Sequence, residues 1–256
     1  MSDKKYNYLD IVMALFLTAL IVSNVASSAK IITWGITLLG LPMSFDGGTL
    51  LFPISYIFGD ILTEVYGYHS TKRIIWIGFL CTALAGLTFW VVSRLPGDPE
   101  WGKFVSDQIY QGSHEGDFDP LATGHAAYDA ILGGMSSGAI IMASLIAYLA
   151  GEFSNSYVLA RMKILTKGRH LWMRTIGSTL IGQAFDTCIF TVVATFAGVF
   201  PISTLMSLII ANFIFKVSIE ALFTPATYRI INFLKRVENE DFYDFETNFN
   251  PFSVSK

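Results

Sequence analysis

Long apolar segments recur along the 256-residue chain, and they constrain its fold more than any other feature. Hydrophobic residues make up 53% of the sequence and charged residues only 14%, whereas a soluble domain usually has about 25% charged residues. Each segment holds roughly the 20 residues that an α-helix needs to cross about 30 Å of hydrocarbon. The runs lack the alternating pattern of a membrane β-barrel. The sequence therefore predicts an all-α, polytopic membrane protein.

We predict six transmembrane helices, called spans 1 to 6 in chain order. Their expected bounds are Tyr8–Ile32, Thr49–Tyr66, Thr71–Arg94, Ala126–Phe153, Leu171–Phe200 and Ile202–Leu234. Residues 1–237 would form a single membrane domain, followed by an acidic tail, 238–256, that is either poorly ordered or packed on the bundle. Span 1 has the basic start of a signal peptide, but its apolar run is too long for one.

The distribution of basic residues orients the bundle. Lys4 and Lys5 precede span 1, and Lys72 and Arg73 lie at the junction of spans 2 and 3. Five more basic residues lie between span 4 and the first turn of span 5: Arg161, Lys163, Lys167, Arg169 and Arg174. The loop 95–125 carries six acidic residues and one lysine. Because basic loops stay in the cytoplasm, we expect both termini there. A three-plus-three repeat would then be inverted, as in many secondary transporters.

Ionisable and amide side chains interrupt the apolar spans. A charge at the bilayer centre costs on the order of 2.5–3.5 kcal/mol, so several such residues need a compensating role. In span 2 and in span 6 they recur every four residues and therefore share a helix face. The set comprises Asn24, Tyr56, Asp60, Glu64, Gln183, Asp186, Asn212, Lys216 and Glu220. We expect spans 1, 2, 5 and 6 to line a polar cavity typical of transporters, with spans 3 and 4 as support.

A purely structural interpretation of these charges is the main alternative. Lys216 could pair with Asp60 or Asp186 simply to let the helices insert. The spans nevertheless hold four carboxylates against two ammonium groups, those of Lys216 and Lys30. Arg174, at the cytoplasmic mouth of span 5, could supply part of the balance. The remaining negative charge calls for a proton, a cation or a ligand with hydrogen-bond donors.

Other functional classes find little support in the sequence. The four histidines have no metal-ligand spacing, and there is no Walker motif or nucleophile elbow. The two cysteines exclude a disulfide framework, and a net charge of −3 gives no reason to expect nucleic acid. Paired carboxylates could act as acid and base, but an intramembrane enzyme lacks the rest of its machinery here. We therefore predict a non-enzyme with no cofactor and no resident metal.

The spans also carry motifs by which the chain resembles the queuosine precursor transporters, also called the vitamin uptake transporter family. Span 2 has the most specific one, Phe-Pro-x-x-Tyr-x-x-x-Asp-x-x-Thr-Glu-x-Tyr-Gly from Phe52 to Gly67. The others are Ser23-Asn24 through Lys30, Arg174-x-x-x-Ser178 with Gln183-x-x-Asp186-Thr187, and Ala211-Asn212-x-x-x-Lys216. The resemblance implies uptake of 7-deazaguanine precursors of queuosine, chiefly 7-cyano-7-deazaguanine, across the inner membrane of a bacterium.

Together, residues and resemblance predict a substrate site. The residues expected to contact substrate are Asn24, Tyr56, Asp60, Glu64, Gln183, Asp186, Asn212 and Lys216. Those expected to gate the path or balance charge are Lys30, Arg174 and Glu220. Asp60 or Asp186 would accept the adjacent donors of a guanine-like edge. The sequence allows transport coupled to a proton or another cation as well as passive transport, and it allows a homodimer. The alternative function is a membrane binding subunit that needs a separate ATP-driven complex.

Overall fold

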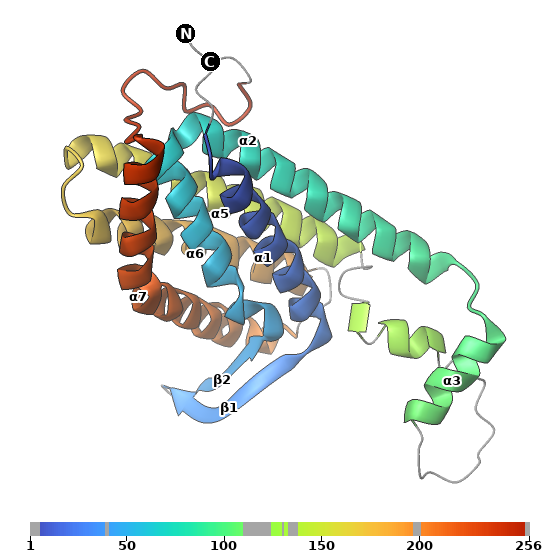
Figure 1. Cartoon of the computed structure of the whole chain (residues 1–256). Coiled ribbons are helices and arrows are strands. Elements are labelled where there is room, and N and C mark those ends of the chain that lie inside the picture. Colours follow the sequence, from blue (N-terminus) through green and yellow to red (C-terminus); the bar gives the residue numbers. More distant parts are fainter. Residues whose placement is uncertain are drawn as a thin grey trace.

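The computed structural model describes residues 6–38, 41–109, 124–129, 131–132, 138–196 and 201–253, and long helices dominate it (Figure 1). These helices are α1 (Leu9–Ala29), α2 (Phe52–Arg94), α3 (Pro99–Ile109), α5 (Gly138–Leu165), α6 (Leu171–Phe196) and α7 (Leu205–Glu238). Four helical segments within the described residues, namely α1, α2, α6 and α7 with the short turn before it, are long and apolar enough to cross a membrane. The expected helical membrane architecture is confirmed to this extent, and the number of six spans stays a prediction.

Helix α2 changes direction at Gly67, which divides it into two arms (Figure 1). Gly67 has φ 82° and ψ 165°, a conformation that side chains disfavour. A Cβ atom at this position would also collide with the ring of Phe242. The two arms correspond to the predicted spans 2 and 3, with Gly67 in place of the turn expected between them.

Helix α5 ends about three turns beyond the expected end of span 4. The prediction was Ala126–Phe153, whereas α5 runs over Gly138–Leu165; residues 124–129 and 131–132 are helical as well, and residues 133–137 lie outside the described part. The prediction ended the span at Phe153 because polar residues follow it. Glu152, Asn155 and Lys163 are in fact buried between helices, so they continue the helix.

A two-stranded antiparallel hairpin, β1 (Ile31–Leu38) and β2 (Leu41–Asp46), follows α1 where a loop was expected. Its first strand is rich in Ile and Thr, which favour strands, and it takes the last two residues predicted for span 1. The ring of Phe45 stacks on Phe215 of α7 at a centroid distance of 4.4 Å, which fixes the hairpin to the bundle. Asp46 then caps the short 3-10 helix η1 (Gly47–Leu50).

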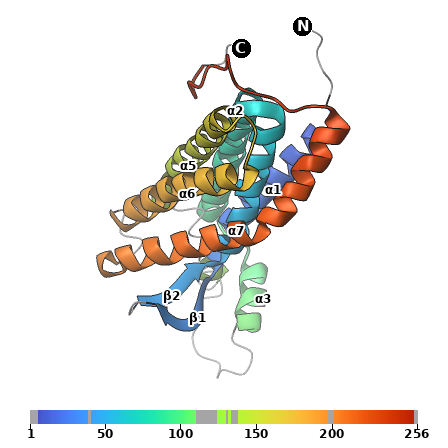
Figure 2. The same ribbon diagram turned by 90° about the vertical axis from the view of Figure 1, so that its left-hand side faces the viewer.

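Helices α5 and α6 pack closely side by side, as Figure 2 shows. Gly151 of α5 and Gly182 of α6 make this possible, because an added Cβ at either position would meet the opposite helix backbone within 3.2 Å. Helix α7 bends midway (Figure 1), and Pro225, which lacks a backbone donor, lies inside it as expected for a kink.

The tail after α7 packs against the end of the bundle near the α2 kink. Asp244 accepts the backbone N–H of Tyr68 at 3.1 Å, and Lys72 donates to the carbonyl of Asn250 at 3.2 Å. The indole N–H of Trp76 donates to the carbonyl of Pro251 at 3.0 Å. Of the two alternatives for the tail, the structure therefore has the packed one. Its location in the cytoplasm stays a prediction.

Candidate functional site

Four helices bring buried polar side chains together inside the bundle, and we call this set the polar cluster. It consists of Tyr56 and Asp60 from α2, Glu152 and Asn155 from α5, Gln183 and Asp186 from α6, and Lys216 and Glu220 from α7. Six of these eight residues were predicted as site residues. The cluster therefore joins predicted spans 2, 5 and 6 with a helix that was expected only to support them.

The α2 side of the cluster fits into the α5–α6 contact. Asp60 accepts a hydrogen bond from the Asn155 amide at 2.8 Å. The ring of Tyr56 lies where the two glycines leave room, because a Cβ at Gly182 would be 3.0 Å from Tyr56 Cε1 and one at Gly151 would collide with its hydroxyl. The same Gly151 position faces Asp186, so the two glycines bring Tyr56 and Asp186 to one place.

The α6 and α7 side of the cluster is held by two polar contacts. Lys216 donates to Asp186 at 2.9 Å, and Thr179 donates to Glu220. Because Thr179, Gln183 and Asp186 follow one another at helical spacing, Gln183 lies on the same face of α6 between the two contacts. The Lys216 ammonium also lies 4.7 Å from the centre of the Phe52 ring, a cation–π distance.

Several atoms of the polar cluster have no hydrogen-bond partner within the described residues. Both polar atoms of the Gln183 amide, both oxygens of Glu152, the Tyr56 hydroxyl, the Asn155 carbonyl oxygen and Glu220 Oε2 belong to this group. Buried polar atoms are normally satisfied, and leaving one unpaired costs about 1–3 kcal/mol. A concentration of such atoms at one place indicates a site for a polar ligand.

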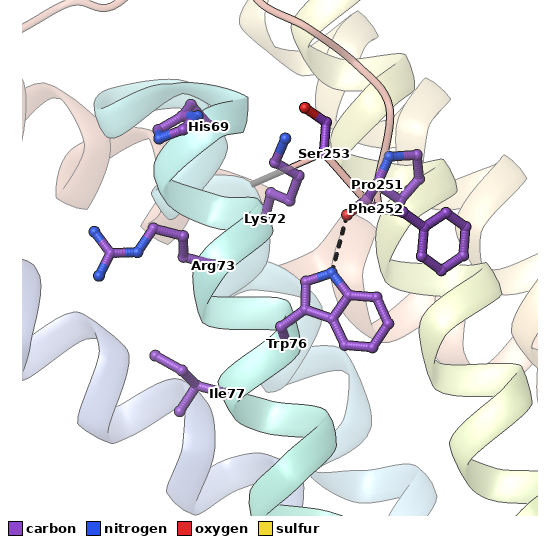
Figure 3. A pocket seen from close by; sticks show the side chains of 8 residues that line it. All are labelled: His69, Lys72, Arg73, Trp76, Ile77, Pro251, Phe252 and Ser253. Atoms are coloured by element: carbon purple, nitrogen blue, oxygen red, sulfur yellow. Dashed lines mark hydrogen bonds between the residues drawn. The ribbon is translucent and has the colours of Figure 1, made fainter. Parts of the chain in front are cut away.

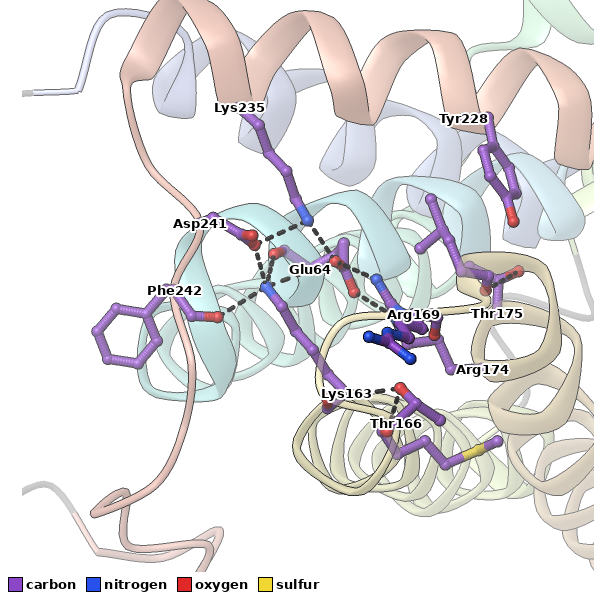
Figure 4. A network of polar contacts seen from close by, with 12 residues as sticks. Glu64, Lys163, Thr166, Arg169, Arg174, Thr175, Tyr228, Lys235, Asp241 and Phe242 are labelled. Carbon is purple, nitrogen blue, oxygen red and sulfur yellow. Dashed lines mark hydrogen bonds and ion pairs between the residues drawn. The ribbon is translucent and has the colours of Figure 1, made fainter.

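Glu64 and Arg174 lie in a separate ionic network, shown in Figure 4. Arg174 donates to both Glu64 oxygens, at 2.7 and 2.8 Å, and Lys235 donates to one of them at 2.5 Å. Lys163 lies 3.4 Å from the same oxygen and also binds Asp241 of the tail at 2.6 Å. Glu64 thus points away from the polar cluster, although it is only one turn from Asp60.

Asp241 connects this network to the tail. It pairs with Lys163 and, at 2.7 Å, with Lys235. Burial raises the pKa of the Asp241 carboxyl, but the hydrogen bonds from the two lysines outweigh burial and hold that pKa below its ordinary value. Since the carboxylate form is favoured in this contact, the Asp241 pairs persist at neutral pH and weaken only as the pH falls through the lowered pKa.

The other predicted residues have separate surroundings. Asn24 donates to the carbonyl of Leu20 and accepts from Ser144 of α5, both at 2.8 Å. Asn212 accepts from Thr49 at 3.5 Å, one helical turn before Lys216. Lys30 is exposed at the end of α1, so it does not take part in the buried charge balance.

Glu152 and Asn155 of α5 were not predicted as members of the candidate site, because span 4 was expected only to support it. The omission follows from the predicted end of that span at Phe153, which put Glu152 at the membrane surface. Their spacing could have identified them, because Asn155 and Ser156 follow Glu152 by three and four residues, the spacing of neighbours on a helix surface.

A groove of about 440 Å³ lies elsewhere, between the second arm of α2 and the tail (Figure 3). His69, Lys72 and Trp76 line it on the α2 side, and Pro251 and Phe252 on the tail side. None of its lining residues belongs to the polar cluster. It is a product of how the tail packs rather than part of the candidate site.

Comparison with known proteins agrees with the motifs of the spans. Residues 46–230 match the family described as "Putative vitamin uptake transporter". A "Probable queuosine precursor transporter" of Bacillus subtilis is 28% identical over 182 residues, which cover 71% of this chain and 69% of that protein. The "Queuosine precursor transporter" of Escherichia coli is 26% identical over 208 residues, with 78% and 81% covered. No solved structure matches. Because the match covers most of the chain and includes the α2, α6 and α7 residues of the polar cluster, the protein belongs to the vitamin uptake transporter family.

Proposed function

We propose that this chain imports a queuosine precursor, 7-cyano-7-deazaguanine or a related 7-deazapurine, across the bacterial inner membrane, and that the substrate binds in the polar cluster. Two curated relatives carry the name of queuosine precursor transporter. Family membership and apolar helices support a multi-pass membrane transporter rather than an enzyme.

The chemistry of a 7-deazaguanine fits the side chains of the cluster. Its N1–H and exocyclic amino group are adjacent donors, and a single carboxylate can accept both. Asp186 is already paired with Lys216, so Asp60, held in place by Asn155, is the better candidate for this edge. The Gln183 amide can donate to the ring carbonyl, and the Tyr56 ring can stack on the base, a contact worth about 1–3 kcal/mol.

The Gln183 amide is the single observation that carries the proposal. It is fully buried, yet neither its nitrogen nor its oxygen has a partner in the described part of the chain. Leucine of similar size would fit a purely structural position better. A ligand that offers both an acceptor and a donor would satisfy the amide, and a guanine-like base offers both.

Uptake by the purified chain in vesicles tests the proposal. We expect saturable entry of labelled 7-cyano-7-deazaguanine with no other protein present, and weak competition by guanine, which lacks the nitrile. Entry that appears only when an ATP-driven complex is added would favour the binding-subunit alternative. If the vesicles take up no 7-deazapurine under either condition, the proposed substrate class is wrong.

Asp60→Asn gives a residue-level prediction. The amide keeps one acceptor oxygen where the carboxylate has two, and it presents an N–H toward the substrate's donors. We expect uptake to fall at least about 100-fold, consistent with the loss of charge-assisted hydrogen bonds worth roughly 1.5–3 kcal/mol each. Membrane insertion and protein amount should stay unchanged, as measured on the same vesicles. Normal uptake by this variant would remove Asp60 from the site.

A further inference from the structure

Glu152 combines complete burial with the absence of a donor. Its side chain is 1% exposed, and neither carboxylate oxygen has a hydrogen-bond partner within the described residues. A Cβ on Gly59 would lie 3.0 Å from Glu152 Oε2, so the carboxylate rests against the α2 backbone beside Asp60. An ionised carboxylate in such a place would have no group to stabilise its charge.

The titratable groups that face Glu152 are acidic or neutral on every helix around it. They are Tyr56 and Asp60 of α2, Tyr148 of α5 itself, Asp186 of α6 and Glu220 of α7. The ammonium of Lys216 is paired with Asp186, and the buried cations Lys163 and Arg174 are paired with Glu64. One ammonium group therefore faces the four carboxylates of the cluster, and like charges at this density cannot all ionise.

The four carboxylates differ in how their charge is stabilised. Asp186 forms an ion pair with Lys216. Asp60 accepts a hydrogen bond from Asn155, and Glu220 accepts one from Thr179. Glu152 accepts no hydrogen bond from the described residues. No group of three histidine, cysteine or acidic side chains in this part of the chain is arranged to hold a metal ion. The compensating ion that fits Glu152 is thus a proton.

We propose that Glu152 is the proton-coupling site of transport, an inference that rests on the proposed function. A proton from the outer solution binds a Glu152 oxygen while the cluster is open to that side. The neutral side chain lets the cluster close around the substrate. After the cluster opens inward, the O–H bond breaks and the proton leaves to the inner solution, so one proton moves with one substrate.

The test uses vesicles containing the purified chain, labelled 7-cyano-7-deazaguanine and no membrane potential. With a proton gradient of about one pH unit, acidic outside, one proton per substrate sets a limit of about tenfold accumulation. The wild type and Glu100→Gln, an exposed control on α3, should approach this limit. Glu152→Gln should show no accumulation but should still exchange internal for external substrate. Retained accumulation, loss of exchange, or accumulation driven by sodium in place of protons would each overturn the proposal.

A second measurement separates this inference from the proposed function. If the wild type exchanges no 7-deazapurine, the proposed function fails, and the proton site is then judged without substrate. The infrared spectrum of the purified protein at neutral pH should contain a protonated carboxyl band that Glu152→Gln reduces and Glu100→Gln does not. An unchanged band would refute the proton site. So would unfolding of Glu152→Gln, because glutamine has the shape of the neutral acid.

Discussion

Glu64→Gln is expected to destabilise the protein more than any other single substitution in the ionic network. The change leaves three cations, those of Arg174, Lys163 and Lys235, around a neutral side chain. Glu64 is 0% exposed, and Arg174 and Lys163 are each 1% exposed, so water cannot replace the lost charge. Breaking a buried ion pair by removing one partner costs about 3–5 kcal/mol.

The measurement is thermal unfolding of the purified protein in detergent, with Asp241→Asn as the matched control. Asp241 binds the same two lysines, but its side chain is 46% exposed, and such pairs contribute about 1 kcal/mol or less. We expect the midpoint to fall by about 10 °C for Glu64→Gln and by no more than about 3 °C for the control. Equal falls in the unfolding midpoint of the two variants would show that the Glu64 ion pairs are no more shielded from water than those of Asp241.

Gln183→Leu is the second substitution with a large expected effect. It should preserve or raise the stability of the protein and lower its affinity for substrate. Leucine removes two buried polar atoms that have no partner in the described structure, so the empty protein should become as stable as the wild type or more stable. Affinity for 7-cyano-7-deazaguanine should fall about 10- to 100-fold, because two contacts worth roughly 1 kcal/mol each are lost.

Both quantities can be measured on the same preparations, by thermal unfolding without ligand and by titration calorimetry with it. Leu180→Gln serves as a comparison, because Leu180 lies on the same helix and is 41% exposed. That variant should bind substrate normally. If Gln183→Leu instead destabilises the protein and binds substrate like the wild type, the amide has a structural role that the described contacts do not reveal.

Much of the site was accessible from the sequence because helical spacing is regular. Asp60 and Tyr56 were expected on one face, and the structure places both against the α5–α6 contact. The pairing of Lys216 with Asp186 was one of two foreseen alternatives. What spacing could not provide was the rotation of each helix, which decides that Glu64 faces Lys163 and Lys235 while Asp60 faces Asn155.

Two misses have clear physical causes. Glu152 was overlooked because its helix was expected to end one residue later, at Phe153, whereas a helix inside a bundle continues as long as its polar side chains face other helices. The β hairpin was overlooked because a short, mostly apolar run after a helix looks the same to a hydropathy window whether it is helical or extended. Gly67, by contrast, was already marked by its position between two apolar runs.

The exposed aromatic residues also show that the sequence alone does not reveal which way a helix face points. Phe185 is adjacent to Asp186 in the sequence and carries a ring that could stack on a base. It is 51% exposed, so its ring faces outward from the bundle rather than into the polar cluster. Tyr56 and Phe52 are the aromatic residues whose described contacts place them at the cluster.

Substrate protection of a buried cysteine next to the polar cluster tests the central claim most directly. Ser156→Cys, in a background with Cys81 and Cys188 replaced by alanine, places a thiol one residue after Asn155 at a fully buried position. We expect a water-soluble thiol reagent to label it slowly as the cluster opens, and saturating 7-cyano-7-deazaguanine to block the labelling. Phe185→Cys in the same background should show no protection. Labelling of Ser156→Cys that substrate leaves unchanged, in vesicles that still transport, would contradict a binding site between α2, α5, α6 and α7.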